Sequence, residues 1–187
     1  GYEVSATPLQ IAMSYAAIAN GGFLLKPYVV EKIEKYDDTI IKNQRNTKKR
    51  ILSQVNAEKL KSMLAHTVEH GSGKQAFISG WNVAGKTGTS KKLVEGKYSE
   101  DEFRSSFVGF FPEENPQLLC LIILDSPDAS RNLHWGSMSA APVFKSVMDR
   151  VINIDKSISI SRSKKEKIKN KPILIQKNFE RKIEYVK

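Results

Sequence analysis

The sequence predicts an α/β (α+β) domain in which helices cover a mainly antiparallel sheet. Strand-like segments are grouped in the middle of the chain, and helix-like segments lie before, between and after them. This grouping favours an antiparallel sheet, because a parallel sheet needs strands that alternate regularly with helices. The chain has 187 residues, of which 40% are apolar and 27% charged. This is the composition of one globular domain, and it excludes disordered, collagenous and repeat proteins.

The positive charge is concentrated at the C-terminal end. Residues 156–187 contain eleven Lys or Arg and three acidic residues, so they hold +8 of the net charge of +10. We expect residues 1–155 to form the folded part and residues 156–187 to form a basic, weakly structured tail. Contact of the tail with anionic lipid or polymer stays open. Nucleic-acid binding is disfavoured, because the basic segment has no aromatic-rich recognition motif.

Two helices are predicted in the first 70 residues. Thr7 and Gln10 form a capping box around Pro8, so a helix begins there, and it ends at the glycines after residue 19. Residues 11–19 are apolar on nearly every side, so this helix should be buried and should need cover on several sides. A second helix is expected over residues 53–70, capped by Ser53. Its buried face should carry the residues at helical spacing, namely Ala57, Leu60, Leu64, Thr67 and Val68.

The strands are predicted from short runs of β-branched and aromatic residues. Residues 28–33 and 39–41 are expected to be strands on either side of a turn at Asp37-Asp38. Residues 81–84 form a strand that leads into the segment Gly85 to Ser90, and the charged residues 91–104 are expected to be a loop or lid. Residues 105–111 and 117–125 form a hairpin around a turn with two prolines. A last helix is predicted after Ser139, with Pro142 in its first turn and Val143, Val147 and Val151 four residues apart.

Cysteine and apolar content exclude three further classes. The single cysteine, Cys120, excludes a disulfide framework and a Cys-based zinc site within this chain. It lies in an apolar run and is expected to be an inert core residue. The longest apolar run, residues 118–124, is far too short to span a bilayer.

The strongest chemical signal is Lys86-Thr87-Gly88, followed by Thr89. A lysine brings positive charge to a carboxylate, and threonine hydroxyls donate hydrogen bonds to the same group. Gly88 has no side chain, so a ligand can approach the backbone closely. The N–H of Thr89 can point at a developing oxyanion. Alone, three residues also fit an ordinary strand end that contains a glycine.

The segments around this motif resemble class B penicillin-binding proteins, and they occur in the order of that family. The resemblance covers residues 1 to about 152. Gly1-Tyr2-Glu3 and the Ala-Ala-Pro-Val-Phe segment at 140–144 are more similar to the septal, cell-division type than to the elongation type. The other matching segments are Thr7-Pro8-Leu9-Gln10, residues 15–22, Gly71-Ser72-Gly73-Lys74-Gln75-Ala76, residues 83–90 and residues 106–112.

The resemblance implies a peptidoglycan D,D-transpeptidase with a β-lactamase/transpeptidase-like fold. Such an enzyme acylates a serine with the penultimate D-Ala of a stem peptide and passes the acyl group to a neighbouring amine. It implies that Lys86 and Thr89 are catalytic and that Lys86, Thr87, Gly88 and Thr89 bind the substrate. In these roles Lys86 attracts the carboxylate and polarises the serine of a Ser-x-Asn motif. The Thr89 N–H supplies half of the oxyanion hole.

Two other family motifs are out of order here. Ser161-Arg162-Ser163-Lys164 fits Ser-x-x-Lys and Ser130-Arg131-Asn132 fits Ser-x-Asn, but both follow Lys86, whereas the family places both before its lysine. Short patterns recur by chance, so we expect neither to be catalytic. The sequence is therefore interpreted as the C-terminal portion of a transpeptidase domain, lacking its N-terminal part. We expect the nucleophile to lie upstream and this chain alone to be inactive.

The family implies several partners and a location. Stem peptides, β-lactam antibiotics, a septal glycosyltransferase and divisome proteins are the expected partners, and no cofactor or metal is implied. The parent protein would be anchored in the bacterial cell membrane by an upstream helix. Its catalytic domain would lie on the periplasmic or extracellular face.

Three alternatives remain from the residues themselves. A β-lactamase-like hydrolase and a non-catalytic penicillin-binding or interaction module would share the fold. The third is a zinc protease, because His66-Thr67-Val68-Glu69-His70 has the spacing His-x-x-Glu-His on a predicted helix. We expect instead a solvated helix end, because His66 and His70 point away from the predicted buried face and histidine suits the C-terminal end of a helix.

Overall fold

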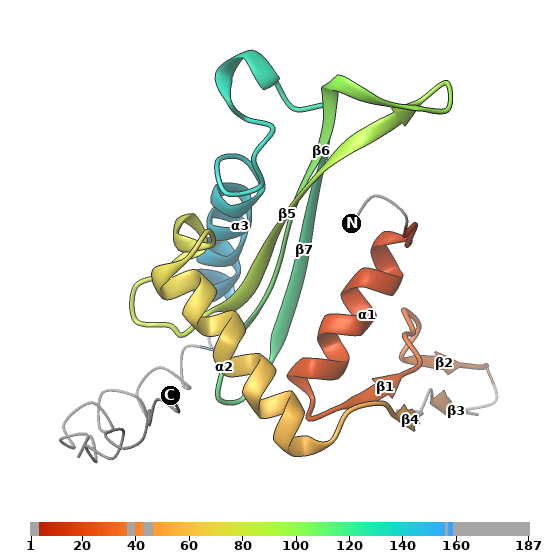
Figure 1. The fold of residues 1–187 in the computed structure, drawn as a ribbon. Helices are drawn as coiled ribbons and strands as arrows, with labels where there is room; N and C mark the ends of the chain where they lie inside the picture. The colour runs from red at the N-terminus through yellow and green to blue at the C-terminus, as the bar shows by residue number, and fades with distance from the viewer. Residues whose placement is uncertain (1–3, 37–39, 43–46, 156, 159–187) are drawn as a thin grey trace, which may run out of the picture.

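The computed structural model describes all residues except 1–3, 37–39, 43–46, 156 and 159–187 (Figure 1). Two short 3₁₀ turns, η1 (Lys74–Ala76) and η2 (Ala129–Arg131), interrupt the connections. The helices are α1 (Pro8–Ala19), α2 (Gln54–His70) and α3 (Ala140–Ile154). The strands are β1 (Phe23–Leu25), β2 (Lys32–Glu34), β3 (Ile40–Lys42), β4 (Thr47–Arg50), β5 (Ala84–Val94), β6 (Lys97–Phe111) and β7 (Leu118–Asp125).

The centre of the fold is an antiparallel sheet in the order β5-β6-β7. In its register Lys86 lies opposite Val108, and Gly109 lies opposite Cys120. Figure 1 views this sheet close to edge-on, with α3 on one side and α1 on the other. Helix α2 packs along β5. The predicted antiparallel sheet with helical cover is confirmed.

Aromatic side chains form the core between β6 and α3. Phe107 and Phe144 are fully buried, and their ring centroids are 4.8 Å apart. Trp81 meets Phe111 edge to face at 5.6 Å. Because side chains in a strand alternate between faces, Phe107 and Phe111 both point toward α3. Ile158, beyond the end of α3, is also buried in this core.

Local hydrogen bonds explain where α1 and α2 begin. The Gln10 N–H donates to the Thr7 hydroxyl at 3.2 Å, and the Thr7 N–H donates to the Gln10 side chain at 2.8 Å. Ser53 accepts from the Asn56 N–H at 3.2 Å. Both predicted caps are confirmed. Ser139 precedes α3 but does not cap it, because its hydroxyl donates to the Trp135 carbonyl instead.

The described residues bury fewer side chains of α1 than of α2. Of α1, Ala17 alone is fully buried by the described residues, and Leu9 is 58% exposed. The predicted face of α2 is confirmed by buried Ala57 and Val68, and Lys61 joins it. The Lys61 ammonium lies 2.8 Å from the Glu58 carboxylate, which keeps the charge paired at the edge of the buried face.

Several predicted strand limits are wrong. Of the strand expected at 28–33, only residues 32 and 33 lie in a strand, β2, which continues to Glu34. Strands β1 and β4, which pair with each other, were not predicted from the sequence. The expected turn at 37–38 lies outside the described residues. Residues 81–83 precede the sheet, and β5 begins at Ala84.

The largest correction concerns residues 91–104, which form a long hairpin and not a loop. Strand β5 continues to Val94, a tight turn follows at Glu95 and Gly96, and β6 begins at Lys97. Both turn residues have positive φ, 49° and 79°, as a two-residue hairpin turn requires. Lys91 pairs with Glu100 across the strands. The many charges suggested a loop, but here they stabilise a solvated hairpin arm.

Candidate functional site

The Lys-Thr-Gly motif lies on an edge strand. Among the residues that the structure describes, strand β5 pairs with β6 alone, in the order β5-β6-β7. Its backbone is drawn close to the core at Gly85, where an added Cβ would lie 2.5 Å from the ring of Phe107. The sequence therefore needs glycine there for packing, whereas the residues that follow are at least partly exposed.

The motif side chains divide between the two faces of the sheet. Because side chains alternate, Lys86 and Gly88 share one face, and Thr87 and Thr89 share the other. Lys86 is exposed, and its ammonium donates to the Thr87 carbonyl at 2.9 Å. This bond holds the ammonium against the backbone of the motif strand at Thr87. An anion at this strand would meet one positive charge and two hydroxyls.

Thr87 is held by a residue from another segment. Its hydroxyl lies 2.8 Å from the hydroxyl of Ser72, and either oxygen can donate. Ser72 lies in the turn that follows α2. The N–H groups of Gly71 and Gly73 both donate to the Thr67 carbonyl at 3.0 Å, which anchors this turn to the helix end.

Thr89 is held by the loop that precedes α3. The Gly136 N–H donates to the Thr89 hydroxyl at 3.0 Å. Gly136 is buried against the sheet, and an added Cβ would lie 2.5 Å from the Ser106 carbonyl oxygen and 2.6 Å from that of Gly88. The loop is also fixed by the Ser105 hydroxyl, which donates to the His134 carbonyl at 2.9 Å. Glycine is therefore required for the loop to reach the motif strand.

The structure brings the four predicted residues together on one strand and adds two that sequence reasoning missed. The sequence indicated Ser72 only as a member of the segment 71–76 that resembles a family segment, without a role of its own, and it did not indicate Gly136. A hydroxyl between two glycines, just after a helix, was the available signal for Ser72. Nothing local indicated Gly136, because its partner Thr89 is 47 residues away.

Ion pairs stabilise the charged arm beyond the motif. The Lys92 ammonium lies 3.0 Å from the Glu102 carboxylate and 3.1 Å from that of Asp125. The hydrogen bond from Lys92 lowers the pKa of Asp125. Hydrogen bonds to Glu102 and Asp125 raise the pKa of Lys92. Both shifts mean that the charged forms are the ones the fold favours.

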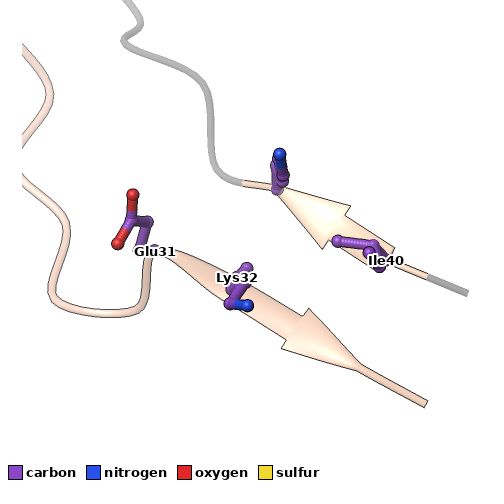
Figure 2. A pocket seen from close by; sticks show the side chains of 4 residues that line it. Glu31, Lys32 and Ile40 are labelled. Carbon is purple, nitrogen blue, oxygen red and sulfur yellow. The ribbon is translucent and has the colours of Figure 1, made fainter. Parts of the chain in front are cut away.

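The described surface also contains a hollow far from the motif in the chain. It has a volume of about 320 Å³ and is lined by Lys32 on β2, by Glu31 just before that strand, and by Ile40 and Lys42 on β3. Figure 2 shows Glu31, Lys32 and Ile40 around this open space. Its lining includes none of the motif residues, so it does not extend the candidate site.

Of the two out-of-order motif matches, the structure describes the one at Ser130. Ser130 lies in η2, exposed, and its hydroxyl donates to the Asp128 carboxylate at 2.6 Å. Together with the Ser130 N–H, this bond lowers the pKa of Asp128. The segment 161–164 and the residues Gly1, Tyr2 and Glu3 lie outside the described residues.

The zinc-protease alternative receives no support from the helix geometry. His66 and His70 are exposed, with ring centroids 4.6 Å apart, and Glu69 approaches His70 to 3.5 Å. Within the described ranges, no group of three or more His, Cys, Asp or Glu side chains is arranged to hold a metal ion. Cys120 is half-buried on β7, and burial raises the pKa of its thiol, so the thiol form is favoured.

Of the helices that the structure describes, none combines the length and apolar character needed to cross a bilayer.

Comparison with known proteins assigns the chain to a family. The family model named Penicillin binding protein transpeptidase domain matches residues 1–149. The chain is 34% identical to Stage V sporulation protein D of Bacillus subtilis, over 79% of this chain and 23% of that protein. It is also 34% identical to the peptidoglycan D,D-transpeptidase FtsI homolog of Mesostigma viride, over 83% of this chain and 28% of that protein. The chain thus spans about a quarter of the length of these curated relatives.

Solved structures agree with the sequence comparison. The apo form of penicillin-binding protein 3 from Mycobacterium tuberculosis superposes with a TM-score of 0.73 at 28% identity, over 82% of this chain and 36% of that one. The complex of that protein with ampicillin superposes with a TM-score of 0.71. The order of the motif segments, the sheet that carries them and these matches agree, and this chain belongs to the penicillin-binding protein transpeptidase domain family.

Proposed function

We propose that this chain forms the carboxylate-binding and oxyanion side of a serine D,D-transpeptidase that cross-links peptidoglycan stem peptides. The observation that carries the proposal is the placement of Lys86, Thr87, Gly88 and Thr89 on the edge strand β5, with both threonine hydroxyls held from outside the sheet. The similarity to proteins named peptidoglycan D,D-transpeptidases supports it.

The chemistry follows from what acyl transfer requires. A serine attacks the carbonyl carbon of the penultimate D-Ala, and the carbonyl oxygen becomes negative in the tetrahedral intermediate. The Thr89 N–H on the edge strand would donate to that oxygen. The terminal carboxylate would be bound by the Thr87 and Thr89 hydroxyls beside the Lys86 charge. The terminal D-Ala then leaves as an amine, and a neighbouring stem-peptide amine takes the acyl group.

The nucleophile and its base are proposed to come from residues outside this sequence. The intact enzyme needs a serine beside a lysine, and the curated relatives are about four times longer than the part that this chain matches. The chain alone would bind weakly and would not form an acyl-enzyme. The Ser130 hydroxyl is a poor candidate for this role, because it is already bonded to a carboxylate in its own turn.

The cellular setting is proposed from the relatives. Relatives named FtsI and Stage V sporulation protein D support a role in septal wall synthesis, beside a glycosyltransferase and other division proteins. We propose a membrane-anchored protein with this domain on the periplasmic or extracellular face, and β-lactams as inhibitors that mimic the stem peptide. The ampicillin complex of the mycobacterial relative supports the last point.

The test uses the full-length protein encoded by the gene, labelled with a fluorescent penicillin. We expect a stable covalent adduct. Lys86→Ala should slow adduct formation about tenfold to a hundredfold, because charge-assisted hydrogen bonds contribute about 1.5–3 kcal/mol each. Lys97→Ala, an exposed lysine at the start of β6, is the matched control and should label at the wild-type rate.

Two results would contradict the proposal. If the wild-type protein is not labelled, the protein is a non-catalytic member of the family. Rapid release of hydrolysed penicillin, measured as loss of β-lactam absorbance over many turnovers, would indicate a β-lactamase-like hydrolase instead of a transpeptidase.

A further inference from the structure

We propose that Ser72 is a positioning residue that sets the direction in which the Thr87 hydroxyl donates. The inference rests on the proposed function, because it concerns the substrate carboxylate at the same strand. It adds a residue outside the Lys-Thr-Gly motif, from the turn after α2. The observation behind it is the 2.8 Å contact between the Ser72 and Thr87 hydroxyl oxygens.

The two threonines are held by chemically different partners. Thr89 accepts from the Gly136 N–H, which can only donate, so the Thr89 proton stays free for a ligand. Thr87 meets a hydroxyl, which can either donate or accept. One proton of the Ser72–Thr87 pair is used between the two oxygens, and the other is free. Which residue keeps the free proton depends on what lies beside the pair.

A bound carboxylate would resolve this choice. With an anion beside Thr87, the favoured arrangement has Ser72 donating to Thr87 and Thr87 donating to the anion. A hydroxyl that accepts one hydrogen bond becomes a stronger donor in the next, so the two bonds reinforce each other. Both threonines would then present a proton to the same carboxylate, beside the ammonium of Lys86.

The fold places Ser72 firmly enough for this role. The neighbouring Gly71 and Gly73 N–H groups donate to the same Thr67 carbonyl, each at 3.0 Å. Gly73 is buried, and an added Cβ would lie 3.2 Å from both the Thr67 oxygen and the Val68 Cα. The backbone of Ser72 is therefore fixed to the end of α2, which packs along β5. The Ser72 side chain itself is exposed, so a ligand can reach the pair.

The test compares two probes on the full-length protein, penicillin and its methyl ester, which lacks the anionic carboxylate. Ser72→Ala should lower the acylation rate constant for penicillin about threefold to tenfold, the range of one hydrogen bond. It should leave the rate with the ester nearly unchanged, so the ratio of the two rate constants falls. Ser72→Thr retains the hydroxyl and should restore the ratio.

A double-mutant cycle tests whether Ser72 acts through Thr87. In the Thr87→Val background, Ser72→Ala should have no further effect on the penicillin rate, because its partner is already gone. Full additivity would mean that Ser72 touches the ligand directly or acts on the fold, and would overturn the inference. Ser62→Ala, an exposed serine on α2, is the matched control. A melting temperature for each variant identifies any variant that fails to fold.

The outcomes separate this inference from the proposed function. If the wild-type protein reacts with neither probe, the proposed function fails and this inference fails with it. If the wild-type protein reacts but Ser72→Ala slows both probes equally, the proposed function stands and the positioning role is wrong. Loss confined to penicillin, with rescue by Ser72→Thr, supports both.

Discussion

At the scale of single residues, the site depends on close contacts that leave no room for a side chain. Gly136 lies against β5 and β6 so closely that a Cβ would be 2.5 Å from the Ser106 carbonyl oxygen and 2.6 Å from that of Gly88. Both obstacles are backbone atoms of the central sheet, which cannot turn aside as a side chain can. The same contact lets the Gly136 N–H reach Thr89.

Gly136→Ala should therefore displace the loop from the motif strand. We expect a loss of about 1–3 kcal/mol in the free energy of unfolding, the usual cost of forcing extra atoms into a packed site. Denaturant unfolding followed by tryptophan fluorescence measures it.

The control for this change is Met138→Ala. Met138 lies in the same loop but is 51% exposed, so its truncation should cost less than about 0.5 kcal/mol. Equal costs for the two variants would mean that the Gly136 contact is not tight.

At the scale of secondary-structure elements, the hairpin arm of β5 and β6 shows how charge can stabilise a strand pair that has little core beneath it. Lys92 bridges Glu102 on β6 and Asp125 at the end of β7. The bridge thus joins all three strands where the arm leaves the sheet. The helix caps at Thr7 and Ser53 also stabilise single elements, but their hydrogen bonds lie within one turn of a helix, whereas the Lys92 ion pairs join separate strands.

The pH dependence of stability should report this bridge. The pKa of Asp125 is lowered by Lys92, so its contribution is present above the ordinary aspartate pKa of about 3.9 and is lost as pH falls through the lower folded value. The pKa of Lys92 is raised, so its contribution is present below about pH 10.4 and is lost as pH rises through the higher folded value. Melting temperature as a function of pH measures both limbs.

Asp125→Asn should flatten the acid limb, since the group that titrates there is gone. Asp101→Asn, an exposed carboxylate on the same arm, is the matched control and should leave that limb unchanged. The same acid limb in Asp125→Asn and in the wild-type protein would show that the bridge does not contribute to stability.

At the scale of the whole molecule, one core holds the sheet to α3, and this core keeps the motif strand in place. Phe144 is fully buried against Phe107, which lies opposite Thr87 in the register of β5 and β6. The outer side of α3 is different, because Val143 is 39% exposed and Val147 is 38% exposed. Of the valine row noted in the sequence, Val143 and Val147 therefore lie largely outside this core, whereas Val151 packs against it.

Adjacent positions on α3 should then respond very differently. Phe144→Ala should lower the free energy of unfolding by about 3–5 kcal/mol, because it leaves a cavity at the centre of the core. Val143→Ala should cost less than about 1 kcal/mol, since much of its side chain already contacts solvent. Denaturant titration of both variants measures the difference. Similar losses in the free energy of unfolding would show that Phe144 does not lie at the centre of the core.

Features within a few residues of each other could be predicted from the sequence. The helix caps at Thr7 and Ser53, the glycines that end α1, the hairpin at the two prolines and the Lys-Thr-Gly motif depend on neighbours along the chain. Their hydrogen bonds and dihedral preferences are local, so the residue types reveal them. The class of fold followed from the order of these elements.

Contacts between distant segments were decided by the tertiary structure. Ser72 meets Thr87 across 15 residues, and Gly136 meets Thr89 across 47. The charged residues 91–104 became strands because a partner strand lay opposite, and Ser139 donated to a carbonyl instead of capping α3. Such pairings depend on which surfaces the folded core brings together, and the pattern of a single segment holds no information on its partner. The sequence by itself therefore determined the local caps, turns and motif and predicted which residues bind a carboxylate, whereas the packing of α2 and the loop before α3 decided how the Thr87 and Thr89 hydroxyls are held.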